Sequence, residues 1–166
     1  MTEQGAPPMA SPHAAAGALF FDDHGRLLLV DPHYKDCHDV PGGYIEPGET
    51  PFQACVREVR EELGIQPPIG GLLVVDWPSR HEEGDEILFL FDGGILSPAL
   101  RDSIRLGADE LAGYDFHPVE ELPGLLIERL TTCVTAAVTA RSIGHPLYLE
   151  NGRTLPEWSA PSCERR

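Results

Sequence analysis

The sequence predicts an α/β fold in which helices pack on the faces of a mixed β-sheet. Short apolar runs bounded by turn residues are typical of strands. Two longer segments repeat apolar residues every three or four positions, as helices do. With 166 residues and no internal repeat, the chain is long enough for one domain with its own core. We expect this domain to span residues 14–155, with flexible tails at 1–13 and 156–166.

Six apolar segments have the length and composition of strands. The first two are separated by Asp22-Asp23-His24-Gly25, which predicts the turn of a β-hairpin. The charged residues 78–85 are expected to form the loop of a second hairpin. Residues 97–108 are ambiguous because Pro98 and Gly107 interrupt them. The six segments are 14–21, 26–30, 72–77, 86–91, 111–118 and 147–149.

The first predicted helix has complete start and stop signals. Thr50 is suited to the N-cap, Pro51 to the first helical position and Gln53 to the third position of a capping box. Gly64 ends the helix by adopting a left-handed conformation at low steric cost. The second predicted helix covers residues 123–141. Its apolar register is carried by Leu126, Leu130, Val134 and Val138.

One face of the first helix is predicted to be apolar and another to be acidic. The glutamates Glu58, Glu61 and Glu62 lie off the apolar stripe and cluster together. Like charges three or four residues apart on a helix repel by roughly 0.2–0.5 kcal/mol per pair, so such a cluster favours a neutralising cation. The alternative is a solvated acidic face. The predicted apolar stripe consists of Phe52, Val56, Val59 and Leu63, widened by Ala54 and Cys55.

Grouped carboxylates suit Mg²⁺ or Mn²⁺ better than zinc, because these hard cations prefer oxygen ligands. The loop Pro41-Gly42-Gly43 precedes the helix, and its glycines allow the backbone to approach the same site. Glu46 and Glu49 add negative charge near the helix start. The sequence therefore indicates a magnesium or manganese site.

The residues around this helix fill a fixed frame. Gly43 is followed after five residues by Glu49, and Glu49 after seven by Arg57-Glu58. The frame continues with an aliphatic residue, any residue, Glu61-Glu62, any residue, Gly64 and an aliphatic residue. Every position is filled. The segment resembles the signature of the Nudix hydrolases.

The resemblance implies an α/β/α sandwich and the hydrolysis of a pyrophosphate linkage in a nucleoside diphosphate derivative, with Mg²⁺ or Mn²⁺ as cofactor. It implies that Glu58, Glu61 and Glu62 are metal ligands, with the carbonyl of Gly42 or Gly43 as a further ligand. Glu49 and Arg57 resemble the pair that fixes the loop against the helix, and Gly43 and Gly64 complete the structural frame.

Three residues are candidates for direct roles in catalysis. Glu61 and Glu62 belong to the predicted metal cluster, and Glu62 is one candidate for the base that activates water. Glu110 is the other, because relatives often carry an assisting acid in a loop beyond the signature. The alternative for Glu110 is an ordinary surface carboxylate.

The sequence contains no second motif that identifies the substrate. Lys35, Arg80 and Tyr34 are candidates for substrate contacts. The alternative is an ordinary surface cation for Lys35 and Arg80, and an aromatic residue of the core for Tyr34. The sequence departs from many relatives before the glycine loop, where it has Cys37-His38-Asp39, and after the second strand, where it has Asp31-Pro32-His33. A nucleoside triphosphate, a nucleotide sugar and ADP-ribose all remain candidate substrates.

The net charge bears on the classes of partner, and the cysteines bear on the cellular compartment. A net charge of −15 argues against binding to duplex nucleic acid or to an anionic membrane, but it is compatible with a small phosphorylated substrate. The four cysteines have no metal-binding spacing and indicate reduced thiols in a cytoplasmic protein. The oligomeric state stays open. The alternative function is a non-catalytic nucleotide-binding sensor on the same fold, although such proteins usually lose the glutamates that this chain retains.

Overall fold

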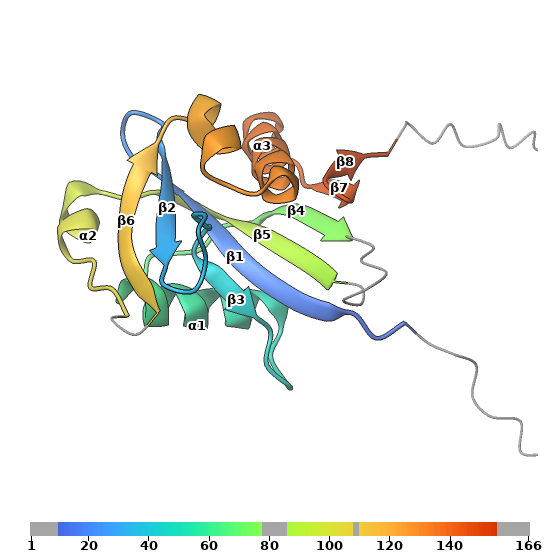
Figure 1. Ribbon diagram of the computed structural model, residues 1–166, viewed down its shortest axis with the longest axis horizontal. Coiled ribbons are helices and arrows are strands. Elements are labelled where there is room, and N and C mark those ends of the chain that lie inside the picture. Colours follow the sequence, from blue (N-terminus) through green and yellow to red (C-terminus); the bar gives the residue numbers. More distant parts are fainter. Residues whose placement is uncertain (1–9, 78–85, 108–109, 156–166) are drawn as a thin grey trace, which may run out of the picture.

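The computed structural model describes residues 10–77, 86–107 and 110–155, and within these ranges it confirms the predicted α/β architecture. An eight-stranded mixed sheet forms the centre of this described part. Helix α1 (Pro51–Leu63) covers one face, and α3 (Glu128–Ile143) covers the other (Figure 1). The fold is therefore a sandwich of three layers.

The described strands form one continuous path, β6-β2-β1-β5-β4-β7-β8, with β3 paired to β1 beside it. Strands β1 and β5 run parallel, as do β4 and β7, and the other pairs are antiparallel. The strands are β1 His13–Phe21, β2 Leu27–Pro32, β3 Gly42–Tyr44, β4 Leu72–Trp77, β5 Glu86–Ile95, β6 Leu111–His117, β7 Leu147–Glu150 and β8 Arg153–Thr154.

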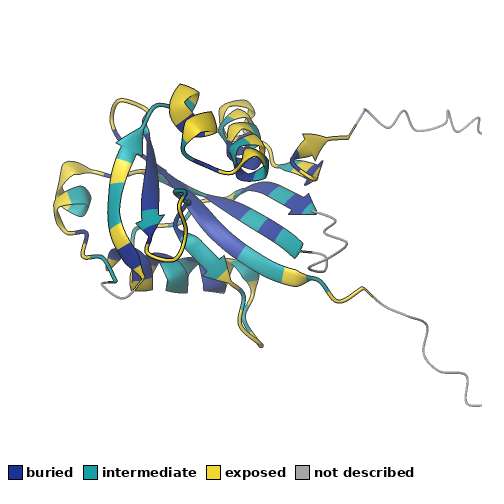
Figure 2. Ribbon diagram, viewed as in Figure 1, coloured by how far each residue is buried: buried dark blue, intermediate teal, exposed yellow. Residues whose placement is uncertain are grey.

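The central strands are buried on both faces, which explains why they read as continuous apolar runs rather than as alternating ones. In β2, Leu27 and Leu29 belong to the core beneath α3, whereas Leu28 and Val30 belong to the core beneath α1. Figure 2 shows this burial along β1 and β2. Two hydrophobic cores therefore share one sheet.

Helix α1 begins and ends at the predicted residues. Thr50 Oγ1 accepts from the Gln53 N–H at 3.2 Å, and Gln53 Oε1 accepts from the Thr50 N–H at 2.9 Å, so both halves of the capping box are present. Gly64 adopts a left-handed conformation with φ of 67°. A Cβ at this glycine would lie 2.7 Å from the Arg105 carbonyl oxygen. The site helix is thus fixed at both ends by local chemistry.

The predicted apolar stripe of α1 is partly wrong. Phe52 is 44% exposed and packs edge-on against Phe91, with ring centroids 5.6 Å apart. The buried face instead consists of small and aliphatic residues together with one carboxylate, Glu62, which is only 7% exposed. The other buried residues of α1 are Ala54, Cys55, Val59 and Leu63.

The second predicted helix is corrected at its start. Residues 119–124 form a short 3-10 helix, η1 (Val119–Gly124), which contains Pro123. The chain is extended at Ile127, and α3 begins at Glu128. A proline at the first helical position loses no hydrogen bond, so Pro123 alone does not exclude the predicted start; the extended backbone at Ile127 does. The break places the first turn of α3 over the sheet.

The remaining differences concern short elements. Strand β5 extends to Ile95, and the ambiguous segment contains a one-turn helix, α2 (Pro98–Asp102). Strands β3 and β8 were not predicted, because each has only two or three residues. Asn151 and Gly152 both have positive φ and connect β7 to β8. The expected loop at 78–85 and most of the expected tails lie outside the described residues.

Two further findings concern the cysteines and the length of the helices. Cys37, Cys55 and Cys133 are free thiols. No helix in the ranges that the structure describes is both long and apolar enough to cross a membrane.

We expect Thr50→Ala to lower the free energy of unfolding by about 1 kcal/mol, because it removes the side-chain acceptor of the capping box. Thr50→Ser is the matched control, since serine keeps the hydroxyl oxygen. Urea unfolding of the three proteins measures the difference. Equal stability of the alanine and serine variants would contradict a stabilising role for the cap.

Candidate active site

A hydrogen bond connects the glycine loop to the last turn of α1. The Gly42 N–H donates to Glu62 Oε2 at 2.9 Å. A Cβ at Gly42 would lie 2.4 Å from the Ala16 carbonyl oxygen, so only glycine allows β3 to run this close to β1. Burial raises the pKa of Glu62 to about 8, and the carboxylates of Glu58, Asp39 and Glu110 add to this rise.

Gly43 lies directly against Glu58. A Cβ at this position would be 2.5 Å from Glu58 Oε1 and 2.6 Å from its carboxylate carbon. The carboxylate of Glu58 therefore occupies the space that any other residue at position 43 would fill. Burial raises the pKa of Glu58 as well. The loop and the helix are mutually fitted at Gly42 and Gly43.

Arg57 connects the loop, the helix start and the glutamates. Its Nε and Nη2 donate to Glu49 Oε1 and Oε2 at 2.8 and 2.9 Å, a two-point contact, and Nη2 also reaches the Tyr44 carbonyl at 3.0 Å. Its Nη1 donates to Glu58 at 2.7 Å and to Glu61 at 3.2 Å. The hydrogen bonds from Arg57 lower the pKa of Glu49.

Glu110, which directly precedes β6, lies near Glu58 and Glu62. Its carbonyl accepts from the His33 N–H at 2.9 Å, which fixes the start of β6 beside the end of β2. The Glu110 carboxylate is among the charges that raise the pKa of both Glu58 and Glu62. It therefore lies within electrostatic range of the acidic cluster, although it is far away in the sequence.

The three glutamates of α1 do not converge on one point in the described structure. Glu58 and Glu61 share the guanidinium group of Arg57, whereas Glu62 contacts the Gly42 N–H. Within residues 10–77, 86–107 and 110–155, no three His, Cys, Asp or Glu side chains form a group that could hold a metal ion. Glu61 has the longest contact with Arg57 and is 49% exposed, so its side chain is the freest to turn.

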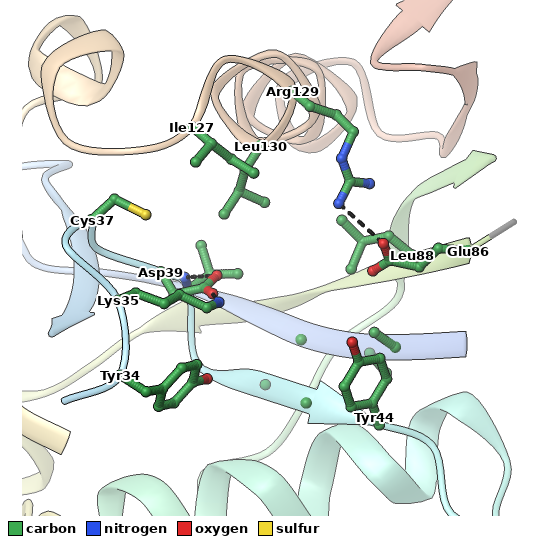
Figure 3. A pocket seen from close by; sticks show the side chains of 16 residues that line it. Tyr34, Lys35, Cys37, Asp39, Tyr44, Glu86, Leu88, Ile127, Arg129 and Leu130 are labelled. Atoms are coloured by element: carbon green, nitrogen blue, oxygen red, sulfur yellow. Dashed lines mark hydrogen bonds and ion pairs between the residues drawn. The ribbon is translucent and has the colours of Figure 1, made fainter. Parts of the chain in front are cut away.

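A cavity of about 400 Å³ opens beside the glycine loop, on the α3 face of the sheet. Strand β1, the loop after β2 and the first turn of α3 enclose it, as Figure 3 shows. Tyr34 and Lys35 line it, as do Gly42 and Gly43. Two candidates for substrate contact thus lie on the same cavity as the glycines that touch Glu58 and Glu62. Arg80 lies outside the described residues.

Lys35 is already engaged in the described structure. Its Nζ donates to Asp39 Oδ2 at 2.5 Å and lies 5.2 Å from the centroid of the Tyr34 ring. Despite its partial burial, the hydrogen bond and charge of Asp39 raise the pKa of Lys35. Lys35 therefore remains a cation at the cavity wall, with Asp39 as a neighbouring carboxylate.

Sequence reasoning missed the residues at the opposite end of the cavity, Glu86 and Arg129. Arg129 Nη2 donates to Glu86 Oε2 at 3.3 Å, and Nη1 donates to Asp76 Oδ2 at 3.5 Å. Asp76 is fully buried and also accepts from the Gly152 N–H at 2.8 Å. An acidic residue in the middle of an apolar strand was the one available signal, because a buried carboxylate needs partners.

Comparison with known proteins gives one family. The NUDIX domain matches residues 11–133. An ADP-ribose pyrophosphatase from Methanocaldococcus jannaschii is 30% identical over 120 residues, which cover 70% of this chain and 68% of that protein. An 8-oxo-dGTP diphosphatase from Escherichia coli is 48% identical over 55 residues, which cover 31% of this chain and 43% of that protein.

Solved structures share the fold. The solved structure of a MutT protein from Methanosarcina mazei Go1 has a TM-score of 0.64 at 22% identity, covering 83% of this chain and 99% of that one. The chain belongs to the NUDIX family and is a diphosphohydrolase of the Nudix type.

We expect Gly43→Ala to lower the hydrolase rate by about 100-fold with little loss of stability. The added Cβ displaces the Glu58 carboxylate, a flexible group, and misplacement of a site residue by about 1 Å costs on this order. Gly71→Ala is the control, since a Cβ there meets nothing within 4 Å. Rates and melting temperatures are measured together. A fully active Gly43→Ala protein would show that the fit of Glu58 to position 43 has no catalytic role.

Proposed function

We propose that the chain is a metal-dependent hydrolase that cleaves the pyrophosphate linkage of a nucleoside diphosphate derivative by attack of water on phosphorus. The observation that carries the proposal is the fit between the glycine loop and the carboxylates of α1, next to a cavity of nucleotide size. Water adds to one phosphorus, the bond to the bridging oxygen breaks, and two phosphorylated products leave.

The chemistry of the glutamate cluster fits Mg²⁺ or Mn²⁺. The donors are hard oxygens, and two of the carboxylates are partly or fully buried with like charges beside them, which raises their pKa. A cation would remove this penalty. Glu58, Glu61 and Glu62 would hold it, together with the carbonyl of Gly42 or Gly43. When bound, such an ion neutralises phosphate oxygens and lowers the pKa of water.

The protein's own residues would orient the reaction and move the proton. The contacts of Arg57 with Glu49 and the Tyr44 carbonyl support a positioning role, because they hold the loop against the helix. Glu61, Glu62 and Glu110 are the candidates for catalytic roles, and Glu62 and Glu110 for the general base. Glu62 is favoured by its tie to the loop, and Glu110 by its exposure and its influence on the cluster.

The substrate class rests on the cavity and on the relatives. ADP-ribose and 8-oxo-dGTP are the substrates in the names of the two relatives, so a nucleotide sugar, ADP-ribose and a nucleoside triphosphate are the first candidates. Tyr34 and Lys35 would contact the substrate from the cavity wall. We place the protein in the cytoplasm, which its free thiols favour.

The direct test is a panel of these nucleotides assayed with Mg²⁺ and with Mn²⁺, with both products identified. Hydrolysis in ¹⁸O-labelled water should place one ¹⁸O atom on a phosphate product, as attack on phosphorus requires. Binding without turnover across the whole panel would contradict the proposal and favour a nucleotide sensor.

We expect Glu62→Gln to lower kcat by about 100-fold or more, because it removes both the negative charge and the capacity to take a proton. Glu46→Gln is the matched control, as Glu46 is exposed in the preceding loop and undergoes the same change of charge. Circular dichroism should show both variants folded. If Glu62→Gln turned over substrate at the rate of Glu46→Gln, Glu62 would have no catalytic role.

A further inference from the structure

The end of the cavity opposite Tyr34 and Lys35 carries a polar pair on largely apolar walls (Figure 3). Glu86 comes from the start of β5 and Arg129 from the first turn of α3 (Figure 3). Leu88, Ile127 and Leu130 line the cavity around them. Apolar walls with a few fixed polar groups are the usual design of a site that orients one part of a ligand.

This end is separated from the glycine loop by a distance suited to a nucleotide. Glu86 pairs with His13 on β1, and Gly42 pairs with Gly17 on the opposite edge of the same strand. Four residues of strand correspond to about 13 Å along β1, and two strand spacings to about 10 Å across it. The diagonal between these two backbone positions is therefore about 16 Å, and both residues line the same cavity.

The charge of the far end selects the base rather than the phosphates. Among the described residues, Glu86 and Asp76 supply two carboxylates against the single guanidinium of Arg129, a net charge of −1. A phosphate would be repelled there. A neutral group with N–H donors would be attracted, since a carboxylate accepts at two oxygens and the contact with Arg129 does not exhaust this capacity.

Asp76 fixes the orientation of the pair. It is buried, accepts from the Gly152 N–H at 2.8 Å and holds Arg129 Nη1 at 3.5 Å. Arg129 thereby reaches Glu86 with Nη2, and its Nε is buried with no partner among the described residues. A guanidinium has five N–H donors, so Arg129 keeps donors beyond these two contacts. The far end thus presents a carboxylate acceptor and a guanidinium donor side by side.

We propose that Glu86 and Arg129 recognise the guanine base of the substrate, a specificity that rests on the proposed hydrolase function. The Watson–Crick edge of guanine has two adjacent N–H donors, N1–H and the 2-amino group, next to the acceptor O6. The carboxylate of Glu86 accepts from both donors, and Arg129 donates to O6. Adenine and uracil each have only one such donor group on this edge, so they match the pair less well.

The test uses binding without divalent metal, so that its outcome does not depend on hydrolysis. The affinities of GDP, IDP and ADP are measured by calorimetry in EDTA. Hypoxanthine in IDP differs from guanine only by lacking the 2-amino group. We expect the wild-type protein to bind GDP about tenfold or more tighter than IDP, since a good bidentate contact discriminates by about this factor. Equal binding of GDP and IDP would overturn the proposal.

Glu86→Gln supplies the second arm, because glutamine keeps the shape of the side chain but places an N–H₂ where a carboxylate oxygen was. We expect the ratio of GDP to IDP affinity to fall to near one. Glu128→Gln is the matched control, as Glu128 is exposed on α3 next to Arg129, and it should keep the wild-type ratio. If Glu86→Gln lowered the melting temperature but left the ratio unchanged, the pair would be structural and the proposal wrong.

The two proposals fail in different ways. A protein that prefers GDP to IDP in EDTA but hydrolyses no nucleotide would retain guanine recognition and lose the hydrolase proposal. A protein that hydrolyses nucleotides of every base equally well, with an unchanged ratio in Glu86→Gln, would retain the hydrolase and lose guanine recognition.

Discussion

One guanidinium group contacts three of the carboxylates at the site. Arg57 donates to Glu49, Glu58 and Glu61, and it reaches the backbone of β3 through the Tyr44 carbonyl. Without it, carboxylates three and four residues apart on α1 would repel one another next to a buried strand. Arg57 therefore links β3 to the loop before α1 and to the acidic face of the helix.

The glycines allow the loop to contact the carboxylates of α1. Because β1 and β3 have no side chains at Gly17, Gly42 and Gly43, the loop lies close enough for Glu62 to accept from a backbone N–H and for Glu58 to fill the space beside position 43. The carboxylates belong to the layer of α1, and the cavity belongs to the layer of α3. Gly42 and Gly43 of β3 connect these two layers, because they contact the carboxylates and also line the cavity.

Features with local causes could be predicted from the sequence. The capping box at Thr50, the stop at Gly64 and the contact of Glu49 with Arg57 depend on residues close together in the chain, and their spacing in the fixed frame defines them. The start of α3 could not be placed in the same way, because the apolar register begins at Leu126, whereas the backbone is still extended at Ile127. The exposure of Phe52 depends on how closely α1 approaches the sheet.

The cavity could not be predicted from the sequence, because it depends on residues that are far apart in the chain. Glu86 and Arg129 are 43 residues apart, and they meet only because β5 lies beneath the first turn of α3. Nothing around either residue marks the other. Asp76, an isolated carboxylate in an apolar strand, was the only trace of this arrangement in the sequence. Long-range pairs of this kind follow from topology rather than from local pattern.

In the proposed site, the glutamates of α1 hold a divalent cation beside the glycine loop. The most direct measurement is a crystal structure of the protein grown with Mn²⁺ and a non-hydrolysable nucleotide, with anomalous data collected at the manganese edge. We expect an anomalous peak bounded by Glu58, Glu61, Glu62 and the backbone of Gly42 or Gly43, with Glu61 turned away from Arg57. Saturating Mn²⁺ with no peak at these glutamates would contradict it.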